Sequence, residues 1–194
     1  MNEHSLILAT HNIGKIAEFK RYLEPLGMHL TTAKEHGVQE PVEDADSFVG
    51  NALIKARAIF QQTKCAALAD DSGLCVNALN GAPGVHSAFY GGEDRDFQKA
   101  MRRVLDELFG ADDRSAYFIS VLVYIDKDGR EHIAEGRING MITKEIRGLE
   151  GFGYDPIFIP EGADKSFGEM TKDEKKLYSH RARALQILLE ILKA

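Results

Sequence analysis

SLILATHNIGK, residues 5–15, is the segment that sets the fold class of this 194-residue chain. Residues 5–10 form a short, mostly apolar run, which predicts a buried strand. A polar turn follows, and Ile16, Phe19 and Leu23 then recur at the spacing of one helix face. A buried strand that leads directly into an amphipathic helix favours an α/β fold.

The rest of the chain mixes expected strands with expected helices. Strands are expected over residues 28–32, 65–69, 117–125, 131–138 and 156–159, and helices over residues 48–60 and 96–109. A terminal helix is expected to carry Leu185, Leu188, Leu189 and Leu192 on one face. Asp128-Gly129 separates two β-rich runs and predicts a hairpin. Crossover and hairpin connections together predict an α/β fold around a mixed sheet. Since the sequence contains no repeat and no flexible linker, we expect a single catalytic domain, residues 1–194.

The composition indicates which classes of macromolecular partner and which cell compartment to expect. The net charge is −6, and proteins that bind nucleic acid polymers usually carry a basic surface, so no such partner is expected. The polar start Met1-Asn2-Glu3-His4 predicts no signal peptide, and no apolar segment is long enough to span a membrane. Cys65 and Cys75 have no metal-binding spacing and are expected to be reduced thiols. These features predict a cytoplasmic protein without a membrane partner.

The acidic segment ADDSG, residues 69–73, is predicted to be a turn that closes a strand. Its adjacent carboxylates, Asp70 and Asp71, point in different directions. One can bind a hard cation or activate water while the other supports the turn, and Ser72 with the glycine after it lets a phosphate approach the backbone. Mg²⁺ prefers one or two carboxylates, waters and substrate phosphates. The alternative is an ordinary acidic turn, because Asp, Ser and Gly are common in turns.

A second candidate region surrounds the first helix. Thr10, Asn12 and Lys15 lie where a strand ends and a helix begins, and free N–H groups there attract phosphate. The Walker A pattern is absent, and the alternative is a capped turn with a solvated lysine. Glu43, in an acidic loop, is a candidate second metal carboxylate, and its alternative is a surface charge. Lys55 is expected on the polar face of the following helix, where a solvated lysine is the default.

The segment GFGYDP, residues 151–156, is a candidate slot for a flat ring. Aromatic side chains between glycines can enclose a base, and Asp155 can accept a hydrogen bond from a base or a sugar. The alternative is a turn that enters a strand, with Phe152 and Tyr154 packed in the core.

A basic cluster near the last helix completes the candidates. Lys175 and Arg181 can neutralise phosphates, and His180 with Arg181 can donate to a keto oxygen. The alternative is a basic helix start on the protein surface.

Taken in order along the chain, these motifs resemble the inosine/xanthosine triphosphate pyrophosphatases, the Ham1-like nucleotide hydrolases. The resemblance runs from Leu6 to the end of the last helix. It rests on Thr10-x-Asn12-x-x-Lys15, Asn51-Ala52-x-x-Lys55-Ala56, ADDSGL (residues 69–74), GAPG (residues 81–84), GFGYDP (residues 151–156) and Ser179-His180-Arg181.

The resemblance implies a two-lobed α/β fold, a single domain around a long mixed β-sheet with flanking helices and the active site in the cleft between the lobes. It also implies a homodimer and Mg²⁺-dependent hydrolysis of ITP, dITP and XTP to the monophosphate and pyrophosphate. By the family's pattern, Thr10, Asn12 and Lys15 hold the phosphates. Asp71 is the general base and a metal ligand, with Glu43 as a second metal carboxylate. Ser72, Lys55 and Lys175 contact phosphate or sugar, while Phe152, Gly153, Tyr154, Asp155, His180 and Arg181 surround the base.

Two stretches depart from the family's pattern. Relatives often have a glycine near the position of Ala45 and a threonine at that of Ser47, which bears on the placement of Glu43. Bacterial relatives often read Ser-Ala-Arg where this chain has Ser87-Ala88-Phe89, so any role of that arginine does not transfer.

Two other functions are consistent with the motifs. A related Maf-like pyrophosphatase would prefer modified pyrimidine or methylated nucleotides. A nucleotide-binding module without turnover is the second alternative, and the presence of both Asp71 and Lys15 argues against it.

Overall fold

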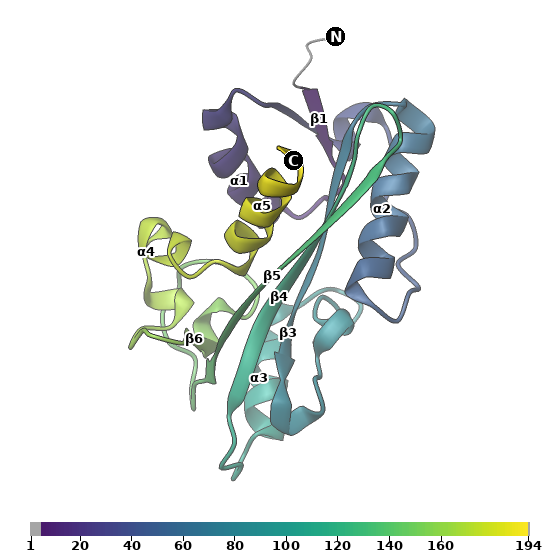
Figure 1. Ribbon diagram of the computed structural model, residues 1–194. Helices are drawn as coiled ribbons and strands as arrows, with labels where there is room; N and C mark the ends of the chain where they lie inside the picture. Colours follow the sequence, from purple (N-terminus) through teal and green to yellow (C-terminus); the bar gives the residue numbers. More distant parts are fainter. Residues whose placement is uncertain (1–4, 194) are drawn as a thin grey trace. The chain divides into compact units, whose positions relative to one another are not determined.

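The chain folds into the mixture of strands and helices that its sequence predicts, as the computed structural model in Figure 1 shows for residues 5–193. The prediction about a signal peptide at residues 1–4 lies outside the described residues. The strands are β1 Ser5–Leu8, β2 His29–Thr32, β3 Ala67–Val76, β4 Ser115–Ile125, β5 Glu131–Ile142 and β6 Phe158–Pro160. The helices are α1 Ile13–Leu23, α2 Phe48–Thr63, α3 Phe97–Glu107, α4 Lys172–Lys176 and α5 His180–Ile191.

The strands form one six-stranded sheet in the order β2-β1-β3-β4-β5-β6. Strand β1 is parallel to β2 and to β3, whereas β5 and β6 are antiparallel. The predicted α/β fold with a mixed sheet and flanking helices is therefore confirmed. No helix among residues 5–193 has the length and apolar character needed to cross a membrane.

The chain divides into two compact units, and the first comprises Met1–Asp71, Val121–Glu135 and Ala184–Ala194. Its core combines β1 with α1 and α5: Leu8, Phe19 and Leu185 are all buried in one apolar cluster. Figure 1 shows α1 and α5 on one side of β1 and α2 on the other. Asn12 caps α1, and Ser47 caps α2 by accepting the N–H of Gly50.

The second unit comprises Ser72–Ser120 and Gly136–Arg183. Its core packs α3 against β4, β5 and β6, and the rings of Phe118 and Phe158 meet with centroids 4.7 Å apart. A capping box precedes α4, because Thr171 and Glu174 bond reciprocally to each other's backbone N–H groups.

The predicted turn over residues 70–73 is wrong, because β3 continues without a break from Ala67 to Val76. Two adjacent carboxylates can stay inside a buried strand when each meets a cation. The pleat directs them to opposite faces, where Asp70 meets Lys15 of α1 and Asp71 meets Lys55 of α2.

Other element boundaries differ from the predictions in detail. The last strand was expected to begin at Pro156, but Pro156 lies in a single 3₁₀ turn, Asp155–Ile157, and β6 begins at Phe158. Strand β5 continues to Ile142, beyond the expected end at Ile138, since it pairs there with β6.

Candidate active site

The turn between β1 and α1 is held by its own polar side chains. Thr10 Oγ1 accepts the N–H of Asn12 at 3.1 Å, and Asn12 Oδ1 accepts the N–H of Lys15 at 3.1 Å. Asn12 is therefore the N-cap of α1. Lys15 Nζ lies 2.8 Å from Oδ2 of the fully buried Asp70, and this ion pair fastens α1 to β3.

Asp71 and Glu43 converge on a single cation, Lys55. The Lys55 Nζ atom lies 3.1 Å from Asp71 Oδ1 and 2.7 Å from Glu43 Oε2. Lys55 is 5% exposed, so the solvated lysine that helix position alone predicted is wrong. Since a buried cation needs partners, the two carboxylates explain why Lys55 lies on the inner face of α2.

The contacts among Asp71, Glu43 and Lys55 determine the pKa values of Asp71 and Lys55. Burial raises the pKa of Asp71 and the charge of Glu43 raises it further, while Lys55 and Lys15 oppose the rise without cancelling it. Burial alone would lower the pKa of Lys55, but Asp71 and Glu43 outweigh burial and raise it. Asp71 is thus a basic carboxylate beside an ammonium that stays charged, which suits a group that must accept a proton.

Asn51 belongs to the same cluster and was not among the predicted site residues. Its Oδ1 accepts the N–H of Ala45 at 3.0 Å, and its Nδ2 lies 3.4 Å from Asp71 Oδ2. The sequence carried a signal for it, because Asn51 and Lys55 are four residues apart and therefore share one face of α2.

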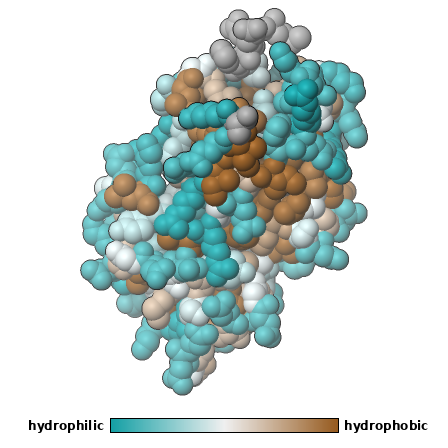
Figure 2. Space-filling view, viewed as in Figure 1, coloured by the Kyte–Doolittle hydropathy of each residue, from teal (hydrophilic) through white to brown (hydrophobic). Residues whose placement is uncertain are grey.

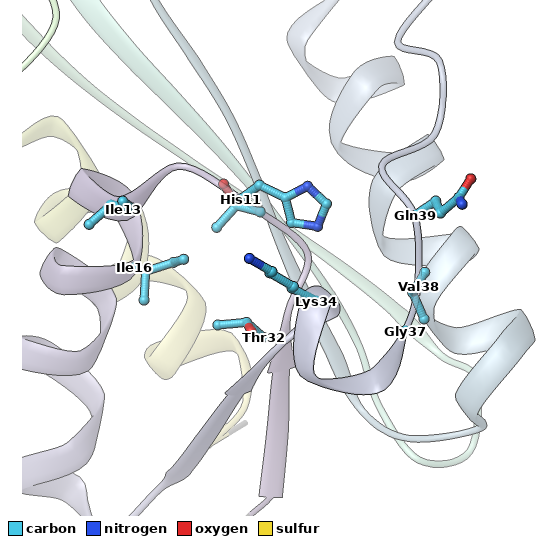
Figure 3. A pocket seen from close by; sticks show the side chains of 9 residues that line it. His11, Ile13, Ile16, Thr32, Lys34, Gly37, Val38 and Gln39 are labelled. Atoms are coloured by element: carbon cyan, nitrogen blue, oxygen red, sulfur yellow. The ribbon is translucent and has the colours of Figure 1, made fainter.

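A cavity of about 580 Å³ opens beside the turn between β1 and α1. It lies beyond the carboxyl ends of the parallel strands β1 and β2, where open α/β sheets commonly bind ligands. Thr10 lines it, and Figure 3 shows Lys34 extending its amino group toward Ile16 and His11.

In the second unit, Asp155 organises the segment over residues 151–156. Its Oδ2 accepts the N–H of Phe152 at 2.7 Å and meets Lys175 Nζ at 2.6 Å. Lys175 Nζ in turn lies 4.7 Å from the centroid of the Phe152 ring. Gly151 has φ +79°, and a Cβ atom there would lie 2.0 Å from Asp155 Oδ2. The glycine is required by close packing as well as by backbone conformation.

The two aromatic residues of this segment have different surroundings. The Tyr154 ring is buried edge-on against Phe97, and its hydroxyl donates to the carbonyl of Ser87 at 2.8 Å. The alternative in which this side chain packs in the core is therefore right for Tyr154. Phe152 is only partly buried, with Arg181 Cζ 5.9 Å from its ring centroid as a second nearby cation. Gly153, between them, has φ +65°.

The Ser179-His180-Arg181 segment is buried rather than a surface helix start. The His180 ring stacks on Phe118 with centroids 4.9 Å apart and planes 9° from parallel. Arg181 is 1% exposed, and its Nη2 donates to Ser72 Oγ at 3.0 Å. Arg181 thus links two predicted contacts, the serine after Asp71 and the Phe152 ring.

Asp71 and Glu43 are suitable donors for a hard divalent cation. Both contact the same ammonium of Lys55, so their carboxylates lie close together. Mg²⁺ commonly takes one or two protein carboxylates and fills its other positions with waters and substrate phosphates. Over residues 5–193, His, Cys, Asp and Glu side chains form no group of three or more placed to hold a metal ion.

Comparison with known proteins places this geometry in a family. The model of the Ham1 family matches residues 6–191. The chain is 46% identical to the dITP/XTP pyrophosphatase of Zymomonas mobilis, over 95% of this chain and 90% of that protein. It is 44% identical to the dITP/XTP pyrophosphatase of Bacillus subtilis, over 97% of this chain and 96% of that protein. A HAM1 protein from Coxiella burnetii has a similar structure, with a TM-score of 0.88 and 39% sequence identity. The match covers 97% of this chain and 98% of that one. The chain belongs to the Ham1 family.

Proposed function

We propose that this chain is a nucleoside triphosphate pyrophosphohydrolase that converts dITP, ITP and XTP to the monophosphate and pyrophosphate. The observation that carries the proposal is the buried Asp71, basic for a carboxylate and placed beside Glu43 and Lys55. Family membership supports it, because relatives 44–46% identical over nearly the whole chain are named dITP/XTP pyrophosphatases. Residues 1–194 act as one catalytic domain.

In the mechanism that we propose, Asp71 accepts a proton from the water that attacks the α-phosphorus, without a covalent enzyme intermediate. Its raised pKa favours this role. Asp71 and Glu43 would hold Mg²⁺, which when bound neutralises charge on the phosphate oxygens. Lys55 keeps one positive charge beside the two carboxylates, so that the cluster is not doubly negative.

The turn between β1 and α1 binds the polyphosphate. Thr10, Asn12 and the N-terminus of α1 supply short donors, and Lys15 supplies positive charge from the first turn. The cavity beside Thr10 supports this assignment, since it offers room at the carboxyl ends of β1 and β2. Ser72 and Lys175 contact phosphate or sugar.

The base is bound by the segment around Phe152 and by His180 and Arg181. Hypoxanthine and xanthine present a 6-keto acceptor where adenine presents a donor. A site that donates at this position leaves its donor unpaired against ATP, and such mismatches reject a substrate by about 10⁴-fold. The buried guanidinium of Arg181 and its contact with the Phe152 ring support this assignment. Tyr154 and Asp155 contribute through the backbone and through the geometry of the loop, because their side chains bond within the protein.

The enzyme acts as a cytoplasmic homodimer in this proposal, without nucleic acid or membrane partners. The two free cysteines fit a reducing compartment. Figure 2 shows apolar atoms gathered over α5, where Ile187 is 41% and Ile191 39% exposed, and apolar surface of this kind favours self-association. Light scattering coupled to size exclusion gives the mass, which is twice the chain mass for a homodimer.

A substrate panel tests the proposed activity. Pyrophosphate release is measured from ITP, XTP, dITP, GTP and ATP, each with and without Mg²⁺. We expect release from the first three, dependent on Mg²⁺, and at least about 10²-fold less from ATP. Release from methylated or modified pyrimidine nucleotides alone would favour the Maf-like alternative, and binding without release would favour the module without turnover.

A further inference from the structure

Asn51 connects the acidic loop to the proposed base. We infer that it is a positioning residue: its side chain fixes Asp71 and the loop that carries Glu43 in the arrangement that catalysis requires. The inference rests on the proposed function and names a residue that acts through others rather than on the substrate. Asn51 is 4% exposed and lies on α2, one turn before Lys55.

The orientation of the Asn51 amide follows from its partners. A backbone N–H can only donate, so the atom facing Ala45 must be the side-chain oxygen, Oδ1. The NH₂ group then faces Asp71 Oδ2, an acceptor. Lys55 binds the other oxygen, Oδ1. Both oxygens of Asp71 therefore have a donor from the same helix, and together the two donors restrict rotation of the carboxylate.

The same side chain holds the acidic loop against α2. Ala45 is two residues after Glu43, so the hydrogen bond from its N–H limits how far Glu43 can move from Lys55. The loop also packs closely at this point, because a Cβ atom on Gly50 would lie 2.5 Å from the Cβ of Ala45. Asn51 thus controls the placement of both carboxylates through one amide.

Two substitutions separate the two contacts of the amide. Asn51→Asp keeps the shape and the acceptor for the Ala45 N–H, but it places a carboxylate against Asp71, which repels that side chain. Asn51→Leu removes both hydrogen bonds at similar volume. Asn77→Asp is the matched control, since Asn77 is an exposed asparagine whose Nδ2 donates to Ser115 Oγ at 2.8 Å.

The kinetic test measures kcat and KM for dITP in these variants, with thermal unfolding as a check of folding. We expect Asn51→Asp and Asn51→Leu each to lower kcat by about 10- to 100-fold with KM within about threefold, and Asn77→Asp to match wild type. Wild-type kcat in Asn51→Asp would overturn the positioning of Asp71. A raised KM at unchanged kcat would also overturn the inference, because it would make Asn51 a substrate contact.

Amide hydrogen exchange tests the same contacts without a substrate. In Asn51→Leu, the Ala45 N–H should exchange at least about tenfold faster than in wild type, and in Asn51→Asp it should stay protected. In Asp71→Ala, the side-chain amide of Asn51 should exchange faster. Unchanged exchange in Asn51→Leu and Asp71→Ala would overturn the inference. Absence of pyrophosphate release by wild type would instead overturn the proposed function, and the exchange data would still decide whether Asn51 holds these groups.

Discussion

The ammonium of Lys55 lies 3.1 Å from Oδ1 of Asp71, inside a cluster in which Glu43 also contacts that ammonium. One positive charge therefore serves two carboxylates. This arrangement keeps Lys55 charged while Asp71 remains more basic than an ordinary aspartate. The cluster comprises Asp71 of β3, Lys55 of α2 and Glu43 of the loop before α2.

Lys55→Met should destabilise the protein, because it leaves two buried or partly buried carboxylates without their cation. Removing one partner of a buried ion pair costs about 3–5 kcal/mol. The free energy of unfolding from urea denaturation at neutral pH measures the loss. Arg57→Met is the matched control on the same helix, since its ion pair with Glu131 is exposed and is worth about 1 kcal/mol or less. Equal losses of unfolding free energy in the two variants would contradict the claim that Lys55 neutralises both carboxylates.

Gly151→Ala should impair the loop that carries Phe152. The new Cβ would lie 2.0 Å from Asp155 Oδ2, so Asp155 must move and release both the Phe152 N–H and Lys175. We expect KM for dITP to rise by about tenfold or more. Gly27→Ala is the control: its φ of +81° brings the same backbone cost, about 1–2 kcal/mol, with no atom within 4 Å of the new methyl group. A normal KM in Gly151→Ala would show that the loop geometry does not matter for substrate binding.

Glu174 should stabilise the protein in a pH-dependent way. Hydrogen bonds from Lys165 and then from Thr171 lower its pKa from 4.5 to about 2. A carboxyl group whose pKa is lower in the folded state stabilises the fold above its unfolded pKa, and this contribution disappears as the pH falls from about 4.5 to about 2. The melting temperature of Glu174→Gln should be below that of wild type at pH 7, and the gap should close toward pH 2. A gap that is independent of pH would contradict this role, and Glu190→Gln, at an exposed position of α5, is the control.

The sequence predicts the fold class, which the structure confirms. It also predicts candidate site residues, and their chemical roles stay a prediction. Both predictions rest on local patterns. Apolar periodicity indicated α1 and α3, the Asp128-Gly129 turn indicated the hairpin of β4 and β5, and the ordered polar motifs indicated the family. The same motifs make Asp71 a candidate base.

The sequence could not show which partner each polar side chain has in the fold. The segment containing Asp70 and Asp71 has turn-forming composition, yet it lies in a strand because Lys15 and Lys55 approach it from two helices. These lysines are 55 and 16 residues away from their carboxylates. In the same way, Tyr154 resembled a ring-slot residue until its hydroxyl was found on Ser87, 67 residues away. Long-range contacts of this kind are not encoded in local periodicity.

Pyrophosphate release from dITP by wild type and by Asp71→Asn, at saturating Mg²⁺, tests the central claim most directly. Asparagine keeps the shape of Asp71 but cannot accept the proton of the attacking water, so kcat should fall by about 10²-fold or more while dITP still binds. Mg²⁺-dependent release by wild type together with this loss would support Asp71 as the base. Release by Asp71→Asn at a rate near that of wild type would contradict it.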